Sequence, residues 1–177
     1  MSSSPATNKI AINCTDPIII GGYPGSGTTM LILTLNQHKN IVGHKETQLI
    51  RVLRILDDYL FCQKNDTFPR YLKRYFSQEE IKRSIGVFID DLLGKKVVVE
   101  GKRRWAEKSP HNCNFLTLWK ACIPKAKFIN VIRDGRDVVC SGMSYGYFKF
   151  EDGIKAWIKT IEESKKESMS LGGKNYC

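Results

Sequence analysis

The feature that most constrains this chain is a glycine-rich turn that directly follows a short apolar run. The run Pro17-Ile18-Ile19-Ile20 is β-branched, which is typical of a strand buried on both faces of a parallel sheet. The turn at 22–29 reads GYPGSGTT and leads into a segment at 28–38 with the composition of a helix. Glycines allow successive backbone N–H groups to converge on one anion at a helix amino terminus. The sequence therefore predicts a strand, an anion-binding loop and a helix, in that order.

The spacing of the turn also limits which anion it is suited to bind. Gly22 and Gly27 are placed as in the Walker pattern G-x-x-x-x-G-K-[ST], but Thr28 stands where that pattern has lysine. Phosphotransferases that use ATP or GTP need this lysine on the β- and γ-phosphates, whereas a nucleotide with a single phosphate here does not. A purely structural turn is the alternative, and the hydroxyl groups beside the glycines favour binding. The predicted phosphate ligands are Gly25, Ser26, Gly27, Thr28 and Thr29.

Strand and helix patterns alternate along the rest of the chain. A capping box at 77–80 predicts a helix that runs to about Leu93 and stops at Gly94. The segment 41–46 is interpreted as the connection between the first two helices. This alternation predicts an α/β fold with a parallel sheet and right-handed crossovers, which places ligands at the carboxyl ends of the strands. The other predicted helices cover 47–61, the segment after Asp134-Gly135 through Met143, and 150–168; the other predicted strands cover 97–99, 105–108 and 127–132.

Size and composition narrow the possibilities further. With 177 residues, 42% of them apolar, the chain is predicted to form one domain at 17–177 after a flexible segment at 1–16. Its net charge of +10 attracts anions, but charge alone does not choose among a nucleotide, an acidic polymer, nucleic acid and a membrane. Aromatic and basic residues are not interleaved, which makes a nucleic-acid partner an unfavoured prediction. The six cysteines lack paired spacings, so we predict free thiols and no metal site.

Four motifs together resemble the sulfotransferases that use 3′-phosphoadenosine 5′-phosphosulfate (PAPS). They are PGSGTT after a strand, KET in the next connection, EKSP, and FINVIRDGRDVVCSG, in this order between residues 17 and 161. The similarity is closest to the tyrosylprotein and heparan-sulfate types. It implies a P-loop-like α/β domain whose central parallel sheet is flanked by helices, with PAPS as donor and no metal. It also implies a hydroxyl acceptor on protein tyrosine or carbohydrate, with an acidic acceptor as one possibility, and a domain that is short at its carboxyl end.

A second phosphate site is predicted after the strand at 127–132. Arg133 follows this strand and Ser141 lies eight residues later, about two turns into the next helix, so both side chains can reach one phosphate. In the family that the chain resembles, the matching positions bind the 3′-phosphate. The alternatives are an ion pair of Arg133 with Asp134 or Asp137, and an ordinary helix-surface position for Ser141. Arg136 is interpreted as a helper or a surface residue.

Two residues are candidates for the chemistry itself. Sulfuryl transfer requires a base opposite the leaving group, and the resemblance assigns this role to Glu46. A helix-start glutamate beside Thr47 is the alternative, and His44 is a second candidate for the base. The resemblance also implies that Lys108 stabilises the charge that grows on the leaving phosphate, against the alternative of a solvated lysine.

The resemblance is incomplete in the anion-binding loop. Gly25 stands where relatives commonly carry lysine or arginine, so one positive charge expected beside the sulfuryl group is absent. Two other functions therefore stay open: a non-catalytic module that binds a nucleotide or a sulfated polymer, and a nucleotide kinase or NTPase with a degenerate Walker loop. No stretch of about 20 apolar residues predicts a membrane span. The expected compartment is the cytoplasm for the sequence as written, or the Golgi lumen if its amino terminus is incomplete.

Overall fold

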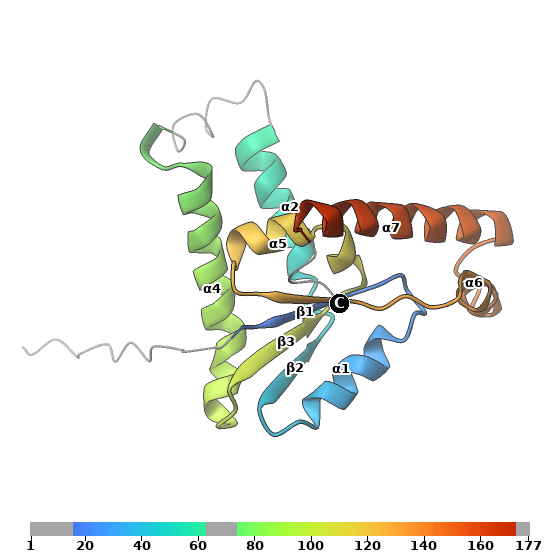
Figure 1. Cartoon of the computed structure of the whole chain (residues 1–177), viewed down its shortest axis with the longest axis horizontal. Helices are drawn as coiled ribbons and strands as arrows, with labels where there is room; N and C mark the ends of the chain where they lie inside the picture. Colours follow the sequence, from blue (N-terminus) through green and yellow to red (C-terminus); the bar gives the residue numbers. More distant parts are fainter. Residues whose placement is uncertain (1–15, 63–73, 173–177) are drawn as a thin grey trace, which may run out of the picture.

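A four-stranded parallel sheet forms the centre of the protein (Figure 1). The structure, a computed structural model, describes residues 16–62 and 74–172, so the segment 1–15 lies outside the described residues. The order across the sheet is β2-β3-β1-β4, and every neighbouring pair is parallel. The predicted α/β architecture is thereby confirmed, and the carboxyl ends of all four strands share one edge. The strands are β1 (Ile18–Gly21), β2 (Ile41–Lys45), β3 (Arg104–Lys108) and β4 (Lys127–Asn130).

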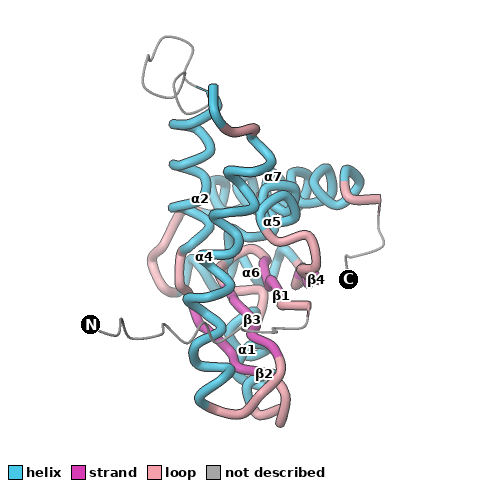
Figure 2. The backbone as a smooth tube through the Cα atoms, turned by 90° about the vertical axis from the view of Figure 1, so that its left-hand side faces the viewer, coloured by secondary structure: helices cyan, strands magenta, loops and turns pink. Residues whose placement is uncertain are grey.

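Helices cover both faces of this sheet. In Figure 1, α1 lies on one side of the strands and α4 on the other. Figure 2 shows α2 running alongside α4, where Lys82 in α4 pairs with Asp57 in α2 at 2.8 Å. No helix in the described parts of the chain is long and apolar enough to cross a membrane. The helical elements are α1 (Thr28–Asn36), α2 (Leu49–Asp57), the π-helical η1 (Asp58–Cys62), α4 (Gln78–Val99), the 3₁₀ turn η2 (Pro110–Asn114), α5 (Leu116–Cys122), α6 (Gly135–Ser144) and α7 (Phe150–Ser170).

The strands bury apolar side chains on both faces because residues alternate in direction along each strand. Ile18 and Ile20 of β1 pack toward Ile32 of α1 in one apolar cluster. Ile19 points the opposite way and belongs to the larger cluster, which is made with α2, α4 and α5. Trp105 and Trp119 are fully buried in this larger cluster. The continuous apolar run of β1 thus reflects a strand covered on both sides.

Two segments differ from the sequence-based prediction. The segment 41–46 is mostly strand β2, which pairs with β3 from Ile41 to Lys45 and was missed because its apolar part is so short. The segment 97–99 is not a strand but the last turn of α4, which continues past its predicted stop at Gly94. Val97 is buried in helical phase with Ile89 and Leu93, whereas Val99 is 85% exposed. A helical period therefore prevails over the β-branched composition of this segment.

Replacing Gly86 with alanine is expected to destabilise the fold. Gly86 lies where α4 crosses α5, and a Cβ atom there would stand 1.9 Å from the Cys122 carbonyl oxygen. Since a backbone atom cannot move aside cheaply, we expect Gly86→Ala to lower the free energy of unfolding by about 1–3 kcal/mol. Urea denaturation measures this loss. Lys95→Ala, on the exposed side of the same helix, is the control and is expected to change little; equal stability of Gly86→Ala and the wild type would contradict the close crossing.

Candidate functional site

The predicted site residues lie where the four strands end, at the carboxyl edge of the sheet. β1 runs into the glycine-rich loop, and β2 is followed immediately by Glu46. Lys108 is the last residue of β3, and Arg133 follows β4 by three residues. Parallel strands bring these four connections together although they are far apart in the sequence. In such a sheet this edge is the usual place for a ligand.

The glycine-rich loop is shaped to receive an anion. Gly25 and Gly27 have φ angles of 90° and 96°, which side-chain-bearing residues rarely adopt, and α1 begins directly afterwards. The Ser26 N–H donates to the Tyr23 carbonyl at 3.0 Å. The Ser26 hydroxyl is buried and has no hydrogen-bond partner among the residues that the structure describes. An unpartnered buried hydroxyl beside a helix amino terminus fits a phosphate group.

The first residues of α1 take the place that lysine has in a Walker loop. Thr28 is 4% exposed and Thr29 is half-buried. The loop also packs against the segment that follows β4, because a Cβ atom on Gly22 would stand 2.5 Å from the Val131 carbonyl oxygen. The glycine at this position therefore allows the glycine-rich loop to lie directly beside the segment that carries Arg133.

Arg133 contacts the phosphate loop and the first turn of α6 at once. Its Nη1 donates to the Gly25 carbonyl at 3.2 Å, and its Nη2 lies 3.5 Å from the Asp137 carboxylate. The alternative ion pair with Asp137 is thus present in the structure, but it does not draw the guanidinium away from the loop. Ser141 lies four residues after Asp137 and therefore on the same face of α6. Arg133 and Ser141 accordingly stay the predicted pair for a second phosphate.

Glu46 and Lys108 form a direct ion pair. The Lys108 Nζ donates to Glu46 Oε1 at 2.5 Å, and the Glu46 N–H donates to the Lys108 carbonyl at 2.6 Å. The Lys108 side chain is only 2% exposed, while that of Glu46 is 46% exposed and accessible to an acceptor. The hydrogen bond and charge of Lys108 hold the pKa of Glu46 below its ordinary value, and Lys45 adds to this effect. The alternative of a solvated Lys108 is therefore wrong.

His44, the second candidate for the base, is directed elsewhere. Its Nε2 lies 3.1 Å from the Leu93 carbonyl in α4. Burial against this helix lowers the pKa of His44, and the nearby Lys96 adds to the effect. Because neighbouring residues of β2 point to opposite faces, His44 lies on the α4 side of the sheet. Among the two candidates, only Glu46 contacts Lys108.

A basic cavity of about 520 Å³ lies between α2, η2 and α7. These elements follow the ion pair closely, since α2 starts three residues after Glu46 and η2 two residues after Lys108. Burial lowers the pKa of His111 in this cavity, and two nearby arginines add to the effect. The sequence did not reveal this cavity because its residues come from three separate elements. The ionisable residues that line it are Arg51, Arg54, His111, Lys159 and Glu163.

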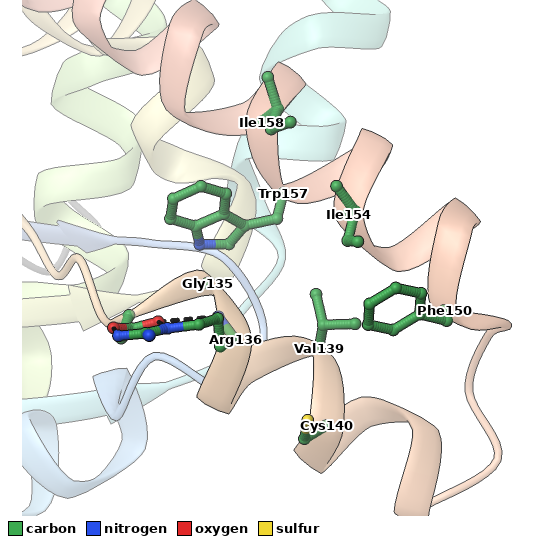
Figure 3. A pocket seen from close by; sticks show the side chains of 9 residues that line it. Gly135, Arg136, Val139, Cys140, Phe150, Ile154, Trp157 and Ile158 are labelled. Carbon is green, nitrogen blue, oxygen red and sulfur yellow. Dashed lines mark hydrogen bonds and ion pairs between the residues drawn. The ribbon is translucent and has the colours of Figure 1, made fainter.

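A second cavity, of about 340 Å³, lies between α6 and α7 and is mainly apolar (Figure 3). Val139, Phe150 and Ile154 face one another in it. Arg136 stays at its edge, with a side chain 89% exposed that pairs with Asp134 at 2.6 Å. This pairing lowers the pKa of Asp134 to about 2. Of the two roles predicted for Arg136, helper or surface residue, its exposure fits the surface residue. The apolar walls of this cavity do not suit a phosphate.

Three cysteines are free thiols, as predicted: Cys113, Cys122 and Cys140. Cys113 and Cys122 are buried, and burial raises the pKa of each thiol to about 11. Cys140 is exposed. Within residues 16–62 and 74–172, no group of three or more histidine, cysteine or acidic residues is placed to hold a metal ion.

Comparison with known proteins points in one direction. The family model described as "Sulfotransferase family" matches residues 17–175. Protein-tyrosine sulfotransferase A from Caenorhabditis elegans is 29% identical over 174 residues, covering 92% of this chain and 44% of the relative. Protein-tyrosine sulfotransferase 1 from Homo sapiens is 27% identical over 160 residues, covering 82% and 40%. The chain thus spans less than half the length of these two relatives.

Solved structures show the same fold at low sequence identity. The sulfotransferase domain from the Synechococcus PCC 7002 olefin synthase superposes with a TM-score of 0.56 at 18% identity, covering 93% of this chain and 66% of that one. The sulfotransferase domain from the curacin biosynthetic pathway gives a TM-score of 0.54 at 14% identity, with the same coverage. The predicted fold is therefore confirmed by independent structures.

Proposed function

This chain belongs to the sulfotransferase family, and from that premise we propose that it transfers a sulfuryl group from PAPS to a hydroxyl group of an acceptor. One observation carries the proposal: a phosphate loop with an unpartnered buried hydroxyl shares a sheet edge with an exposed carboxylate paired to a buried ammonium. This combination offers an anion site, a proton acceptor and a fixed positive charge without a metal. These are the groups that sulfuryl transfer needs.

The donor would be held at its two phosphate positions. The backbone N–H groups at the start of α1 and the hydroxyls of Ser26 and Thr28 suit the 5′-phosphate, because they lie together where the glycine-rich loop enters the helix. Arg133 and Ser141 suit the 3′-phosphate, which is the group that separates PAPS from ordinary adenine nucleotides. When bound, PAPS supplies the sulfuryl group and a phosphate leaving group.

The ion pair divides the chemistry between two side chains. The Glu46 carboxylate accepts the proton of the attacking hydroxyl, which its exposed position allows. The Lys108 ammonium provides positive charge in a place nearly free of water, where a fixed charge is worth more than in solvent. The hydrogen bond between Lys108 and Glu46 supports this proposal, because both groups must lie close together to act on one reacting centre.

We propose a tyrosine in an acidic protein segment as the acceptor. The relatives with this activity in their names are protein-tyrosine sulfotransferases, and the basic cavity opens between the two elements that follow the ion pair. Three basic residues line it, Arg51, Arg54 and Lys159. Lys159 pairs with Glu163 and Arg54 pairs with Asp58, both at 3.8 Å, which still leaves a net positive charge there. Such a surface attracts acidic residues on either side of a tyrosine.

Calorimetry with adenosine 3′,5′-bisphosphate, ATP and AMP tests the donor assignment. The bisphosphate is expected to bind more tightly than AMP, because only the bisphosphate uses the Arg133 and Ser141 site. Preference for ATP would instead support the kinase alternative. Transfer of radiolabelled sulfate from PAPS to a peptide with tyrosine between acidic residues then tests the reaction, with the phenylalanine peptide as control.

Arg133→Ala is expected to weaken binding of the bisphosphate by roughly 10- to 150-fold, the worth of one hydrogen bond to a charged group. Its effect on AMP affinity should be small, since AMP lacks the 3′-phosphate. Arg136→Ala, which removes an 89% exposed guanidinium three residues farther along the chain, is the matched control and is expected to bind normally. Equal losses for the two variants would mean that the general positive field, not a specific site, holds the ligand.

Gly25 supports a second candidate function, a module that binds the nucleotide without transfer. Its φ angle of 90° suits glycine, and a lysine or arginine there would be strained. The loop shape and the missing charge are therefore linked. Bisphosphate binding without sulfate transfer to any hydroxyl acceptor would favour this second function.

A further inference from the structure

Successive residues of the connection between β2 and α2 form hydrogen bonds with the end of β3. Beyond the bonds of Glu46 already described, the Thr47 Oγ1 donates to Glu107 Oε1 at 2.8 Å. The Gln48 N–H donates to the Ser109 hydroxyl at 3.2 Å. The short segment that carries the proposed base is thus held along its whole length by one strand end.

This fastening is needed because the segment has an unfavourable backbone. Glu46 and Gln48 have φ angles of 56° and 57°, in the left-handed region that disfavours residues with a side chain. Such conformations persist when the surrounding contacts determine them, and they occur often at functional sites. Thr47 lies between the two strained residues, so its bond to Glu107 is well placed to maintain both.

Glu107 is a fully buried carboxylate with neutral partners. Its Oε1 accepts hydrogen bonds from Thr47 and, at 2.6 Å, from the Ser109 hydroxyl, and its Oε2 accepts one from Asn112 Nδ2 at 2.6 Å. Burial raises the pKa of Glu107, while these hydrogen bonds oppose the rise. A buried carboxyl group is costly and packing alone does not require one. The position of Glu107 therefore points to a role other than filling space in the core.

The same carboxylate is linked to β1. Asn112 Nδ2 also donates to the Ile20 carbonyl at 2.9 Å, just before the glycine-rich loop. Its Oδ1 accepts the Trp119 indole N–H at 3.1 Å, which fixes the amide with its N–H groups toward Glu107. The network therefore runs from the base of the phosphate loop, through Glu107, to the connection that carries Glu46.

We propose that Glu107 is a positioning residue that holds Glu46 against Lys108 from the opposite face of the sheet. Neighbouring residues of a strand point to opposite faces, so Glu107 lies beneath the pair while Lys108 belongs to it. This inference depends on the proposed function only where it predicts that Glu107 affects the rate of transfer. The effect on the geometry of Glu46 can be measured without any transfer reaction.

Thr47→Val tests the link without changing the shape of the side chain. The variant removes the hydroxyl bond to Glu107 and leaves only the bond that the Thr47 N–H makes to the same carboxylate, so Glu46 should be held less firmly against Lys108. A ¹³C titration of the Glu46 carboxyl is expected to show its pKa rising toward the ordinary glutamate value, since the groups that lower it are Lys108 and Lys45. Thr47→Ser keeps the hydroxyl and is expected to restore the low pKa.

Thr117→Val is the matched control. The Thr117 hydroxyl also donates to a glutamate distant in sequence, Glu167 in α7, at 2.7 Å. Loss of the Thr117–Glu167 bond should leave the titration of Glu46 unchanged, because this bond joins α5 to α7 and does not involve the segment that carries Glu46. An equal shift in both variants would overturn the specific role of Glu107 in favour of general destabilisation.

Glu107→Gln tests the residue itself. The glutamine oxygen can still accept from two hydroxyls, but its NH₂ group must then face the fixed NH₂ group of Asn112. We expect the pKa of Glu46 to rise and kcat to fall on the order of tenfold to a hundredfold, as a misplacement of about 1 Å produces. Affinity for adenosine 3′,5′-bisphosphate should stay the same.

The outcomes separate this inference from the proposed function. If the wild type binds the bisphosphate but transfers no sulfate, the proposed function fails, while the titration of Glu46 still reports on positioning. If Glu107→Gln and Thr47→Val lower the melting temperature but leave the titration of Glu46 as in the wild type, Glu107 is only structural and the inference is wrong.

Discussion

Glu46→Gln is expected to reduce kcat by about 10²- to 10⁴-fold, the usual contribution of a positioned general base. Glutamine keeps the size of the side chain and can still accept the Lys108 hydrogen bond, but it cannot take a proton from the acceptor hydroxyl. Binding of adenosine 3′,5′-bisphosphate, measured by calorimetry, should not change, because the phosphate loop and Arg133 are untouched. The predicted pattern is thus a loss of transfer with retained donor binding.

Glu100→Gln is the matched control for this prediction. Glu100 is also a glutamate paired with lysine, at 3.0 Å from Lys102, but it lies at the end of α4. Its replacement is expected to leave kcat at the wild-type value. Nearly full transfer by Glu46→Gln would show that another group is the base, and the direction of His44 toward Leu93 argues against that residue.

Lys108→Met is expected to reduce kcat by about 10²- to 10³-fold, comparable with the loss of one fixed donor from an active site. Methionine has a similar length, so the variant removes the charge while leaving little empty space. The acidic limb of the pH–rate profile should also move upward, because the pKa of Glu46 is held below 4.5 mainly by the Lys108 hydrogen bond. A profile of kcat against pH measures both effects at once.

The lowered pKa of Glu46 also affects the stability of the fold. A carboxyl group whose pKa is lower in the folded state stabilises the fold above its unfolded pKa, and this contribution is lost as the pH falls through the folded pKa. For Glu46 the loss therefore occurs below about pH 4.5. Because this side chain is 46% exposed, solvent screens the pair and the stability effect should be modest.

Lys102→Met provides the control for Lys108→Met. Lys102 is likewise poorly exposed, and its Nζ donates to the Asn36 and Ile41 carbonyls at 3.2 and 2.9 Å. This variant should lose stability but retain the position of the acidic limb. An unchanged acidic limb in Lys108→Met would mean that the ion pair does not set the titration of Glu46.

Much of the architecture could be predicted from the sequence because its signals are local. A β-branched run followed by glycines and hydroxyl residues specifies a buried strand and a tight loop, whatever the rest of the chain does. Lys108 and Arg133 could then be placed at the same edge as this loop, because parallel strands end together. The pattern of 97–99 was misleading, since three valines in a row suit a strand as well as the last turn of a helix.

The details of the site depend on contacts that no local pattern contains. The two residues of the ion pair are 62 positions apart, and Thr47 is 60 positions from Glu107. Which of His44 and Glu46 meets Lys108 was decided by β2, a strand that the sequence did not indicate, and by its pairing with β3. The basic cavity likewise required three elements to pack together.

The sequence by itself therefore determined the fold class, the glycine-rich loop and the sheet edge where the candidate site lies, since hydrophobic period and turn chemistry act over a few residues. Only the tertiary structure decided which side chains meet there and that a buried glutamate supports them from the other face. The physical reason is that strand register and helix packing, set by the whole core, fix the direction and the distance of every side chain at that edge.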